Sequence, residues 1–173
     1  MPNVMLDLET MGTRPGSAII AIGACTFKSD GIGEEFYTKI SLKSCMSYAF
    51  DIDPSTVMWW MQQSDKARAE FKDNEAQTNI YEALNKFKDW LPEKSKIWGN
   101  GSDFDNALLA EAYNRVHRPV PWKFWDNRCY RTMKNLAPSL PYEKVGTAHN
   151  ALDDAKSQAR HLIKIMAMLQ GRG

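Results

Sequence analysis

The segment VMLDLETMGTRPGSAIIAIGACTF, residues 4–27, contains two runs with the composition of β-strands. VMLDLE (4–9) and SAIIAIGACTF (17–27) are rich in apolar side chains, and the second run is also rich in β-branched ones. MGTRPG, which lies between them, carries the Gly and Pro residues that favour a turn. Each run is therefore predicted to be a strand, with a turn between the two.

The chain that follows adds a third strand and then changes to helical periodicity. EEFYTKIS (34–41) follows Asp30-Gly31, a dipeptide typical of hairpin turns, so the first three strands are predicted to form an antiparallel meander. Asp53-Pro54 then supplies a helix N-cap and a first helical residue. The expected helices begin at Pro54 and Ser64 and span 75–91, 102–116, 129–136 and 148–169, with two further strands at 96–100 and 123–126. This order predicts an α/β fold, in which a mixed five-stranded sheet combines the antiparallel meander with parallel strands and is flanked by helices.

Length and composition predict one domain over residues 1–173. Of the 173 residues, 43% are hydrophobic, which is enough to bury a sizeable core. The three cysteines, Cys25, Cys45 and Cys129, have no CxxC spacing, which argues against a disulfide framework or a zinc ribbon. The N-terminus resembles no secretory leader, and no stretch approaches the roughly 18 apolar residues of a membrane span. A cytoplasmic protein is therefore expected.

The charge balance limits how the chain could bind nucleic acid. Lys and Arg together number 22 against 21 Asp and Glu, so no global positive field is present to hold a long polyanion by counterion release. Any binding of nucleic acid must therefore depend on local contacts.

Two carboxylates lie on the first predicted strand. Asp7 and Glu9 are two residues apart and so point to one face of the strand, while Val4, Leu6 and Leu8 point to the other. Adjacent carboxylates of this kind are held by hard cations such as Mg²⁺. A solvent-exposed acidic face explains the same pattern, and this motif alone leaves both interpretations open.

A second carboxylate site follows the predicted strand at 96–100. GNGSDFDNALLAEAY (99–113) begins a helix whose expected N-cap is Ser102, which places Asp105 at position N3. Ser-x-x-Asp is close to a capping box and requires no catalysis. However, a carboxylate in the first turn of a helix that follows a strand can also face a ligand in an α/β sheet. Both readings stay open for this motif too.

The third site opens the last helix. In HNALDDAKSQ (149–158), the expected apolar stripe places Asp153 toward water and Asp154 on the flank of the helix. His149 is five residues before Asp154, so it must act from the loop or the first turn. The alternative for His149 is a partly exposed N-terminal histidine without a catalytic role. The expected core stripe is Leu152, Ala155, Ala159, Leu162, Met166 and Leu169.

Taken together and in order, DLET (7–10), Phe104-Asp105 and HNALDDA (149–155) resemble the motifs of the DEDDh 3′–5′ exonucleases. This group includes the proofreading subunit of bacterial DNA polymerase III and RNase T, and the resemblance implies their RNase H-like fold. One residue more than usual separates Asn100 from Phe104, so Asp103 is the fallback for Asp105. Residues 51–68 look more like a phage and bacterial subgroup of exonucleases than like the polymerase subunits, which would place a phage-encoded protein in the bacterial host cytoplasm.

The resemblance implies a two-metal site. Asp7 would bridge two Mg²⁺ or Mn²⁺ ions, Glu9 and Asp154 would serve the ion that carries the nucleophilic water, and Asp105 would support the other. Two such ions clamp the attacking and leaving oxygens at phosphorus. His149 would be the general base, because an ordinary histidine pKa of about 6.5 allows it to accept a proton near neutral pH.

The expected substrate is the 3′ end of single-stranded nucleic acid, with a lean toward DNA over RNA because the resemblance is to phage exonucleases. Trp60 shares a stripe with Val57 and Met61 and is expected in the core, which leaves Trp59 to stack on a base. The other expected contacts are Thr10 and Met11 to the terminal nucleotide, and Arg128 and Arg131, with Lys134, to phosphates. Core packing of Trp59 and a solvated basic helix face are the alternatives.

Three other functions stay open at this point. The same carboxylates would serve a metal-dependent hydrolase of small nucleotides, a catalytically silent binding protein could retain the motifs, and a structural protein could show them by coincidence. A homodimer is compatible with the resemblance, since some members of the group are dimers.

Overall fold

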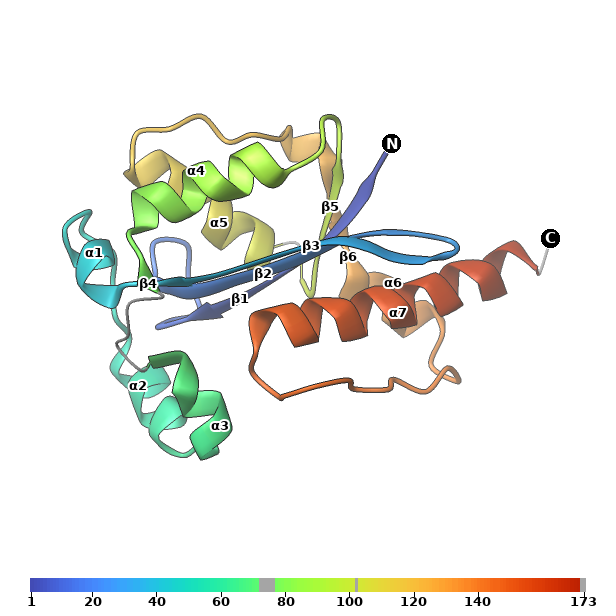
Figure 1. The fold of residues 1–173 in the computed structure, drawn as a ribbon. Helices are drawn as coiled ribbons and strands as arrows, with labels where there is room; N and C mark the ends of the chain where they lie inside the picture. The colour runs from blue at the N-terminus through green and yellow to red at the C-terminus, as the bar shows by residue number, and fades with distance from the viewer. Residues whose placement is uncertain (72–76, 102, 172–173) are drawn as a thin grey trace.

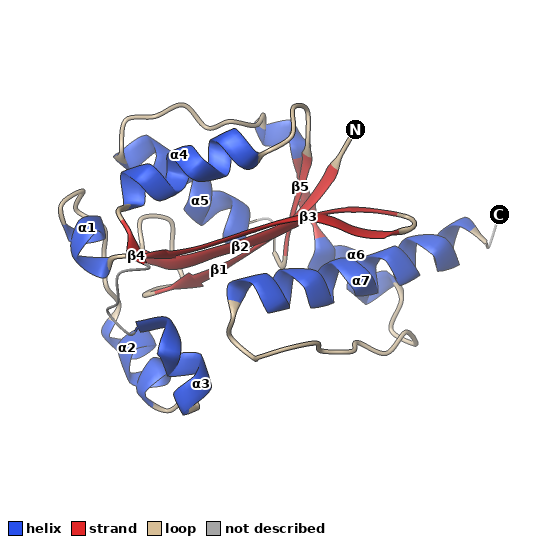
Figure 2. Cartoon of the chain, in the orientation of Figure 1, coloured by secondary structure: helices blue, strands red, loops and turns tan. Residues whose placement is uncertain are grey.

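The computed structural model describes residues 1–71, 77–101 and 103–171. Its strands are β1 (Asn3–Thr10), β2 (Ile19–Lys28), β3 (Gly31–Ile40), β4 (Gln77–Thr78), β5 (Lys96–Gly99) and β6 (Asn127–Cys129). Its α-helices are α1 (Leu42–Met46), α2 (Pro54–Met61), α3 (Asp65–Arg68), α4 (Ile80–Trp90), α5 (Asp105–Arg115), α6 (Tyr130–Leu136) and α7 (Ala151–Gln170), and two short 3₁₀ helices are η1 (Ala69–Phe71) and η2 (Phe124–Asp126). Figure 2 shows how helices and strands are distributed.

The strands form one mixed sheet in the order β4-β3-β2-β1-β5-β6. β1, β2 and β3 are antiparallel neighbours, which confirms the predicted meander, and β5 and β6 extend it as parallel strands beyond β1. The sheet has six strands rather than the expected five, because β4 pairs with β3 through only two residues, too few to give a periodic pattern. The strand predicted at 123–126 is wrong. A bond from the Asp126 N–H to the Lys123 carbonyl closes a turn there, and pairing with β5 begins only at Asn127.

The central strand β1 is buried on both faces. Val4, Leu6 and Leu8 belong to the larger apolar core, whereas Met5 belongs to the smaller core that also contains residues of α7. Asp7 therefore faces α7, and it accepts a hydrogen bond from α7. The prediction that the carboxylates of β1 share one face of the strand is confirmed, and the solvent-exposed acidic face is excluded because Glu9 is buried.

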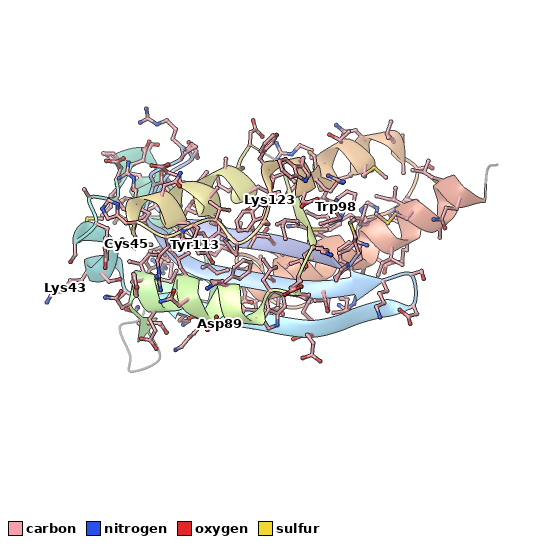
Figure 3. The ribbon with its side chains drawn as sticks, turned by 90° about the horizontal axis from the view of Figure 1, so that it is seen from above. Lys43, Cys45, Asp89, Trp98, Tyr113 and Lys123 are labelled. Carbon is pink, nitrogen blue, oxygen red and sulfur yellow. The ribbon has the colours of Figure 1, made fainter. Side chains whose placement is uncertain are left out.

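Helices cover both faces of the sheet (Figure 1). α4 and α5 lie on one face, and α6 and α7 lie on the other, with α2 and α3 on the same side as the N-terminal end of α7. The hydroxyl of Tyr113 in α5 donates to the carbonyl oxygen of Leu84 in α4 (2.7 Å), which ties the two helices together (Figure 3). In the described parts of the chain, no helix is long and apolar enough to cross a membrane.

Helix α7 approaches the sheet more closely than the sequence predicts. A Cβ atom on Gly23 of β2 would lie 2.1 Å from the backbone carbon of Ala151, so only glycine permits this contact. The buried face of the helix is also rotated relative to the expected stripe. Ala151, Gln158 and Ile165 are buried, as are Ala155, Ala159 and Leu162 of the expected stripe, while Leu152, Met166 and Leu169 are only half-buried.

The helix starts correct two further predictions. Helix α5 begins at Asp105 with Phe104 as its N-cap, so Asp105 is the first helical residue and not N3. Ser102, the expected cap, lies outside the described residues, as does residue 75, the expected start of the helix that begins at Ile80. The predicted N-cap Asp53 is confirmed by its side-chain hydrogen bonds to the first turn of α2. Ser64, the predicted start of the next helix, is the N-cap of α3, and its side chain accepts from the Ala67 N–H.

Candidate active site

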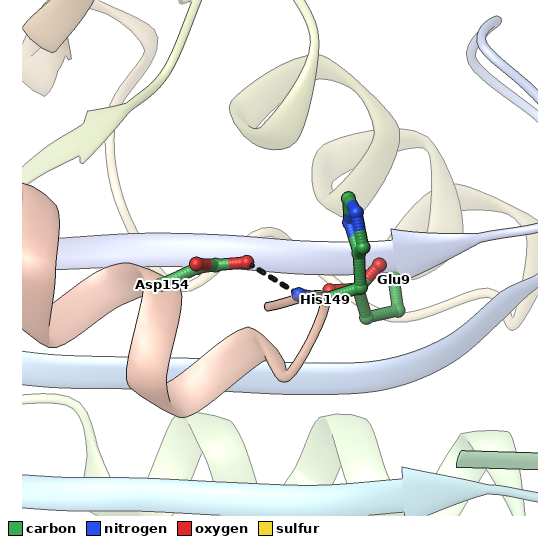
Figure 4. A group of neighbouring side chains, drawn as sticks. All are labelled: Glu9, His149 and Asp154. Atoms are coloured by element: carbon green, nitrogen blue, oxygen red, sulfur yellow. Dashed lines mark hydrogen bonds between the residues drawn. The ribbon is translucent and has the colours of Figure 1, made fainter. Parts of the chain in front are cut away.

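Three potential metal ligands converge beside the C-terminal end of β1. Glu9 lies on β1, His149 precedes the N-cap of α7, and Asp154 lies in the first turn of that helix. One ligand atom of each lies within 4.8 Å of the other two. The His149 backbone N–H donates to Oδ2 of Asp154 (3.1 Å), and Figure 4 shows this bond as a dashed line with Glu9 close to His149. The loop before α7 is thereby fixed to the helix, and His149 lies in this loop, where the sequence placed it.

Asp7 completes this group from the same face of β1. Burial raises its pKa well above the ordinary value, and the negative charges of Asp105, Glu9 and Asp154 raise it further, while a hydrogen bond from Gln158 opposes the shift. Four carboxylates therefore repel one another in a poorly solvated region, an arrangement that a bound cation would relieve.

Asp105 lies behind Asp7 and is 2% exposed. Its Oδ1 accepts the Leu8 N–H (3.2 Å) and its Oδ2 accepts the Asn100 N–H (2.9 Å), so the carboxylate joins β1 to the end of β5. Burial raises the pKa of Asp105 to about 7, although these hydrogen bonds lower it. Asp103, the fallback from the sequence, is exposed, so the structure brings Asp105 and not Asp103 to the carboxylate group.

His149 is held by its backbone and by aromatic rings. Its φ of +61° lies in the left-handed region, which costs a non-glycine residue about 1–3 kcal/mol and is common at functional sites. Its ring meets that of Trp59 edge to face, with centroids 5.0 Å apart, and lies 6.1 Å from the ring of Trp60. Burial lowers the pKa of His149, as does the positive charge of Lys144, while Asp154 raises it. The neutral imidazole is favoured, which is the form that accepts a proton.

A cavity of about 640 Å³ opens over these residues. Asp7, Glu9, His149 and Asp154 line it, and Asp105 does not, because its carboxylate faces backbone amides beneath the cavity wall. The remaining wall is contributed by residues of β1 and its turn, α2, the α5 start, α6, the loop before α7 and α7 itself: Leu8, Thr10, Gly12, Thr13, Ser55, Thr56, Trp59, Trp60, Asn100, Phe104, Tyr130, Lys134, Tyr142, Lys144 and Gln158.

Only some of the expected substrate contacts line this cavity. Thr10 and Trp59 line it, and Trp59 is 42% exposed. Trp60 is buried, as predicted, and its indole N–H donates to the Thr10 carbonyl (2.9 Å). Met11 does not reach the cavity, because its side chain packs in the core while its backbone bonds to Ala18 and Asp53.

The basic residues on and before α6 also divide into two groups. Lys134 lines the cavity, and Arg131 donates to the carbonyl of Asn100 (2.8 Å), which lies in the cavity wall. Arg128 does not line the cavity. Its guanidinium donates to the carbonyls of Trp125 and Asn127, because it precedes α6 on strand β6 instead of lying on the helix face.

Sequence analysis missed several residues of this site. Gln158 is four residues after Asp154, so its helical position on the same face was a usable signal. Lys144 and Tyr142 lie in a segment without periodicity, and nothing in the sequence indicated them. Asp153 was predicted to face water but is half-buried, because its carboxylate accepts the Thr147 N–H (2.8 Å) and so fixes the loop.

The donor set fits a hard divalent cation. Carboxylate oxygens dominate it, with one imidazole, and Mg²⁺ and Mn²⁺ prefer such oxygen-rich sites. The Lys144 Nζ atom lies 2.8 Å from Oδ1 of Asp154 and offsets part of the negative charge. The positions, the charge and the chemistry of these residues are therefore compatible with divalent metal ions.

Comparisons with known proteins identify the family. The sequence model of the 3′–5′ exoribonuclease Rv2179c-like domain matches residues 2–166. An exodeoxyribonuclease of Enterobacteria phage T4 is 25% identical, with 76% of this chain and 70% of that protein covered. The nuclease domain of 3′hExo, a DEDDh family member bound to rAMP, has a TM-score of 0.62 at 15% identity, with coverage of 96% and 92%. Exonuclease X in complex with 5′ overhanging duplex DNA has a TM-score of 0.60 at 17% identity, with the same coverage.

These similarities agree with the ordered carboxylate and histidine motifs and with the RNase H-like sheet. The two solved structures share the fold, and the family match extends over nearly all of the chain. The chain therefore belongs to the 3′–5′ exoribonuclease Rv2179c-like family and is a 3′–5′ exonuclease.

Proposed function

We propose that the protein hydrolyses the last phosphodiester bond at the 3′ end of single-stranded nucleic acid and releases nucleoside monophosphates, using two Mg²⁺ or Mn²⁺ ions. The observation that carries this proposal is the convergence of Asp7, Glu9, His149 and Asp154 on one cavity, with Asp105 directly behind it. The family match over residues 2–166 supports a single exonuclease domain.

In this proposal the carboxylates of Asp7, Glu9, Asp105 and Asp154 would hold the ions. Bound ions of this kind would neutralise charge on the phosphate and stabilise the attacking and leaving oxygens. Asp7 is the natural shared ligand because it interacts with each of the other three carboxylates. Each Asp105 oxygen accepts one backbone N–H and keeps a further lone pair, so this carboxylate could support an ion while it stays bonded to β1 and to the end of β5.

His149 is proposed as the general base. The lowered pKa keeps its imidazole neutral at physiological pH, so it can take the proton of an attacking water. The fixed backbone, with its bond to Asp154, limits where the imidazole can lie. Such positioning favours proton transfer because the acceptor must lie within hydrogen-bond reach of the water.

Thr10 and Trp59 are proposed to receive the terminal nucleotide, since both line the cavity and Trp59 is partly exposed. Lys134 and Arg131 are proposed to meet phosphates, Lys134 from the wall and Arg131 from beside Asn100. Met11 and Arg128 are not retained as substrate contacts, because their side chains are engaged elsewhere.

Single-stranded DNA is the first candidate substrate. The similarity to a phage T4 protein that is an exodeoxyribonuclease supports it. The family description names exoribonucleases, which makes RNA the second candidate. The two differ at the 2′-hydroxyl, so matched oligomers compare them directly.

The experiment is digestion of 5′-labelled single-stranded DNA and RNA of the same sequence, with Mg²⁺ and again after addition of EDTA. We expect a ladder that shortens from the 3′ end, mononucleotide products, and no reaction in EDTA. Asp105→Asn should reduce the rate strongly, while Asp103→Asn, a matched control at an exposed position, should not. Hydrolysis of free nucleotides with intact oligomers would overturn the proposal in favour of a small-nucleotide hydrolase.

A further inference from the structure

Gln158 brings an uncharged amide into the carboxylate group. It lies on α7 one turn after Asp154, is 4% exposed and lines the cavity. Its Nε2 donates to Oδ1 of Asp7 at 2.7 Å. This bond orients the Asp7 carboxylate, since an amide N–H requires an acceptor in the plane of its own group.

The other end of the same amide has no partner. Within the described part of the chain, three buried side-chain atoms lack a hydrogen-bond partner, Trp90 Nε1, Asn106 Oδ1 and Gln158 Oε1. Of these, Gln158 is the one whose residue lines the cavity. A buried carbonyl oxygen without a donor destabilises the fold, so its presence in the wall of a ligand site points to a donor that arrives with the ligand.

A glutamine suits this place for a chemical reason. The Asp7 carboxylate needs a donor, and a water bound to a divalent ion offers only donors to its surroundings. An amide can donate to the Asp7 carboxylate and accept from the metal-bound water. An ionised Glu offers no donor and would repel Asp7. Residues that bind metal ligands in this way commonly change metal affinity or activity by about 10- to 100-fold when they are replaced.

We infer that Gln158 is a positioning residue of the metal site, which orients Asp7 through its N–H group and accepts, through Oε1, a hydrogen bond from a water on the ion that Asp7 binds. The inference rests on the proposed metal-dependent function. It adds to the proposed metal site a residue that is not itself a metal ligand.

The test replaces Gln158 by Met, which keeps the length of the side chain and removes both hydrogen bonds. Isothermal titration with Mn²⁺ should give about 10- to 100-fold weaker binding for Gln158→Met than for the original protein. Leu162→Met is the matched control, since Leu162 is buried one turn further along α7. Its Mn²⁺ affinity should be unchanged. Equal affinity in Gln158→Met and Leu162→Met would overturn the inference.

Thermal unfolding in EDTA separates this role from a merely structural one. Because Gln158→Met leaves the buried Asp7 carboxylate without this donor, its melting temperature in EDTA should be somewhat below that of Leu162→Met. The stabilisation that added Mn²⁺ confers should be smaller. A lower melting temperature in EDTA with an unchanged Mn²⁺ increment would assign Gln158 a packing role only and overturn the inference.

A measurement on the original protein does not depend on the folding of any variant. The Gln158 side-chain NH₂ signals, observed in ¹⁵N-labelled protein, should shift on Mg²⁺ titration and saturate together with metal binding. Unmoved signals at saturating Mg²⁺ would contradict the inference. If neither the original protein nor Leu162→Met binds Mg²⁺ or Mn²⁺, the proposed function itself fails, which is a different outcome.

Discussion

The indole ring of Trp59 stands edge-on to the imidazole of His149, with ring centroids 5.0 Å apart and planes at 88°. This contact covers one side of the proposed base, while the rest of the indole faces the cavity and is 42% exposed in total. One residue can therefore both restrict His149 and stack on a base.

Replacing Trp59 by Ala should weaken binding of a short single-stranded oligomer by about 5- to 150-fold, since stacking of a base on an aromatic ring contributes about 1–3 kcal/mol. Fluorescence anisotropy with Ca²⁺ in place of Mg²⁺ would measure this without turnover. Trp59→Phe should recover much of the affinity. Trp125→Ala, which removes an exposed indole that does not line the cavity, is the control. Equal effects of Trp59→Ala and Trp125→Ala would remove Trp59 from the substrate site.

Lys144 should compete with metal ions for Asp154. Its Nζ atom lies 2.8 Å from Oδ1 of Asp154, so a cation that binds this oxygen must displace the ammonium group. Lys144→Ala should therefore bind Mn²⁺ about 2- to 10-fold more tightly, a modest effect because the lysine is partly exposed. Lys134→Ala is the matched control, since this lysine also lines the cavity but lies 5.4 Å from the centre of the Tyr142 ring. Titration calorimetry that gives unchanged or weaker Mn²⁺ binding for Lys144→Ala would refute the competition.

The thiols should react selectively. Burial raises the pKa of Cys25 to about 12 and that of Cys45 to about 11, and the thiolate is the reactive form. In native protein at pH 8, Ellman's reagent should label Cys129 first, and unfolding should release the other two. Peptide mass spectrometry would identify the sites. Labelling of Cys25 at the rate of Cys129 would contradict the buried position.

The same two thiols imply a loss of stability in alkali. Their folded pKa values lie above the ordinary thiol value of about 8.5, so the folded state favours the protonated form. Their contribution to stability is complete below that pH and is lost progressively as pH rises toward about 11 for Cys45 and about 12 for Cys25. Cys25→Ala with Cys45→Ala should reduce this part of the alkaline destabilisation in a urea titration.

The absence of a side chain at Gly23 allows α7 to lie close to the sheet. A methyl group there would meet the Ala151 backbone at 2.1 Å, so Gly23→Ala should lower the free energy of unfolding by about 1–3 kcal/mol or more through overpacking. Gly171→Ala is the control, because its nearest neighbour would lie at 3.5 Å, an ordinary contact. Equal urea midpoints for the two variants would show that α7 does not rest on Gly23.

Local patterns predicted the meander, the shared face of Asp7 and Glu9, and the loop position of His149. These follow from strand alternation and helix capping, which depend on near neighbours in sequence. The buried face of α7 was not predictable in the same way, because it depends on packing against β1, β2 and β3, which are far from that helix in the chain. Sequence spacing also gave the wrong capping role for Asp105, whose oxygens bind the amides of Leu8 and Asn100.

Two residues that were predicted as substrate contacts, Met11 and Arg128, do not line the cavity. Met11 directly follows the carboxylate strand, but its side chain turns into the core as the backbone pairs with Ala18. Arg128 was expected on a helix face, yet it lies on an edge strand and binds nearby carbonyls. Lys144 reaches the site from a loop, where no periodicity constrains a side chain. None of these positions follows from the periodicity of apolar residues in the sequence.

The geometry permits two roles for His149, since one of its ring nitrogens lies within 4.8 Å of ligand oxygens of Glu9 and Asp154. The decisive measurement is the Mg²⁺ dissociation constant and the rate of 3′-end hydrolysis on one preparation of His149→Asn, a substitution that tolerates the left-handed backbone. If His149 is the general base, the Mg²⁺ affinity should be unchanged while the rate falls by about 10²- to 10⁴-fold. Equal losses in affinity and rate would make His149 a metal ligand, and an undiminished rate would remove it from the reaction; either result would contradict the account.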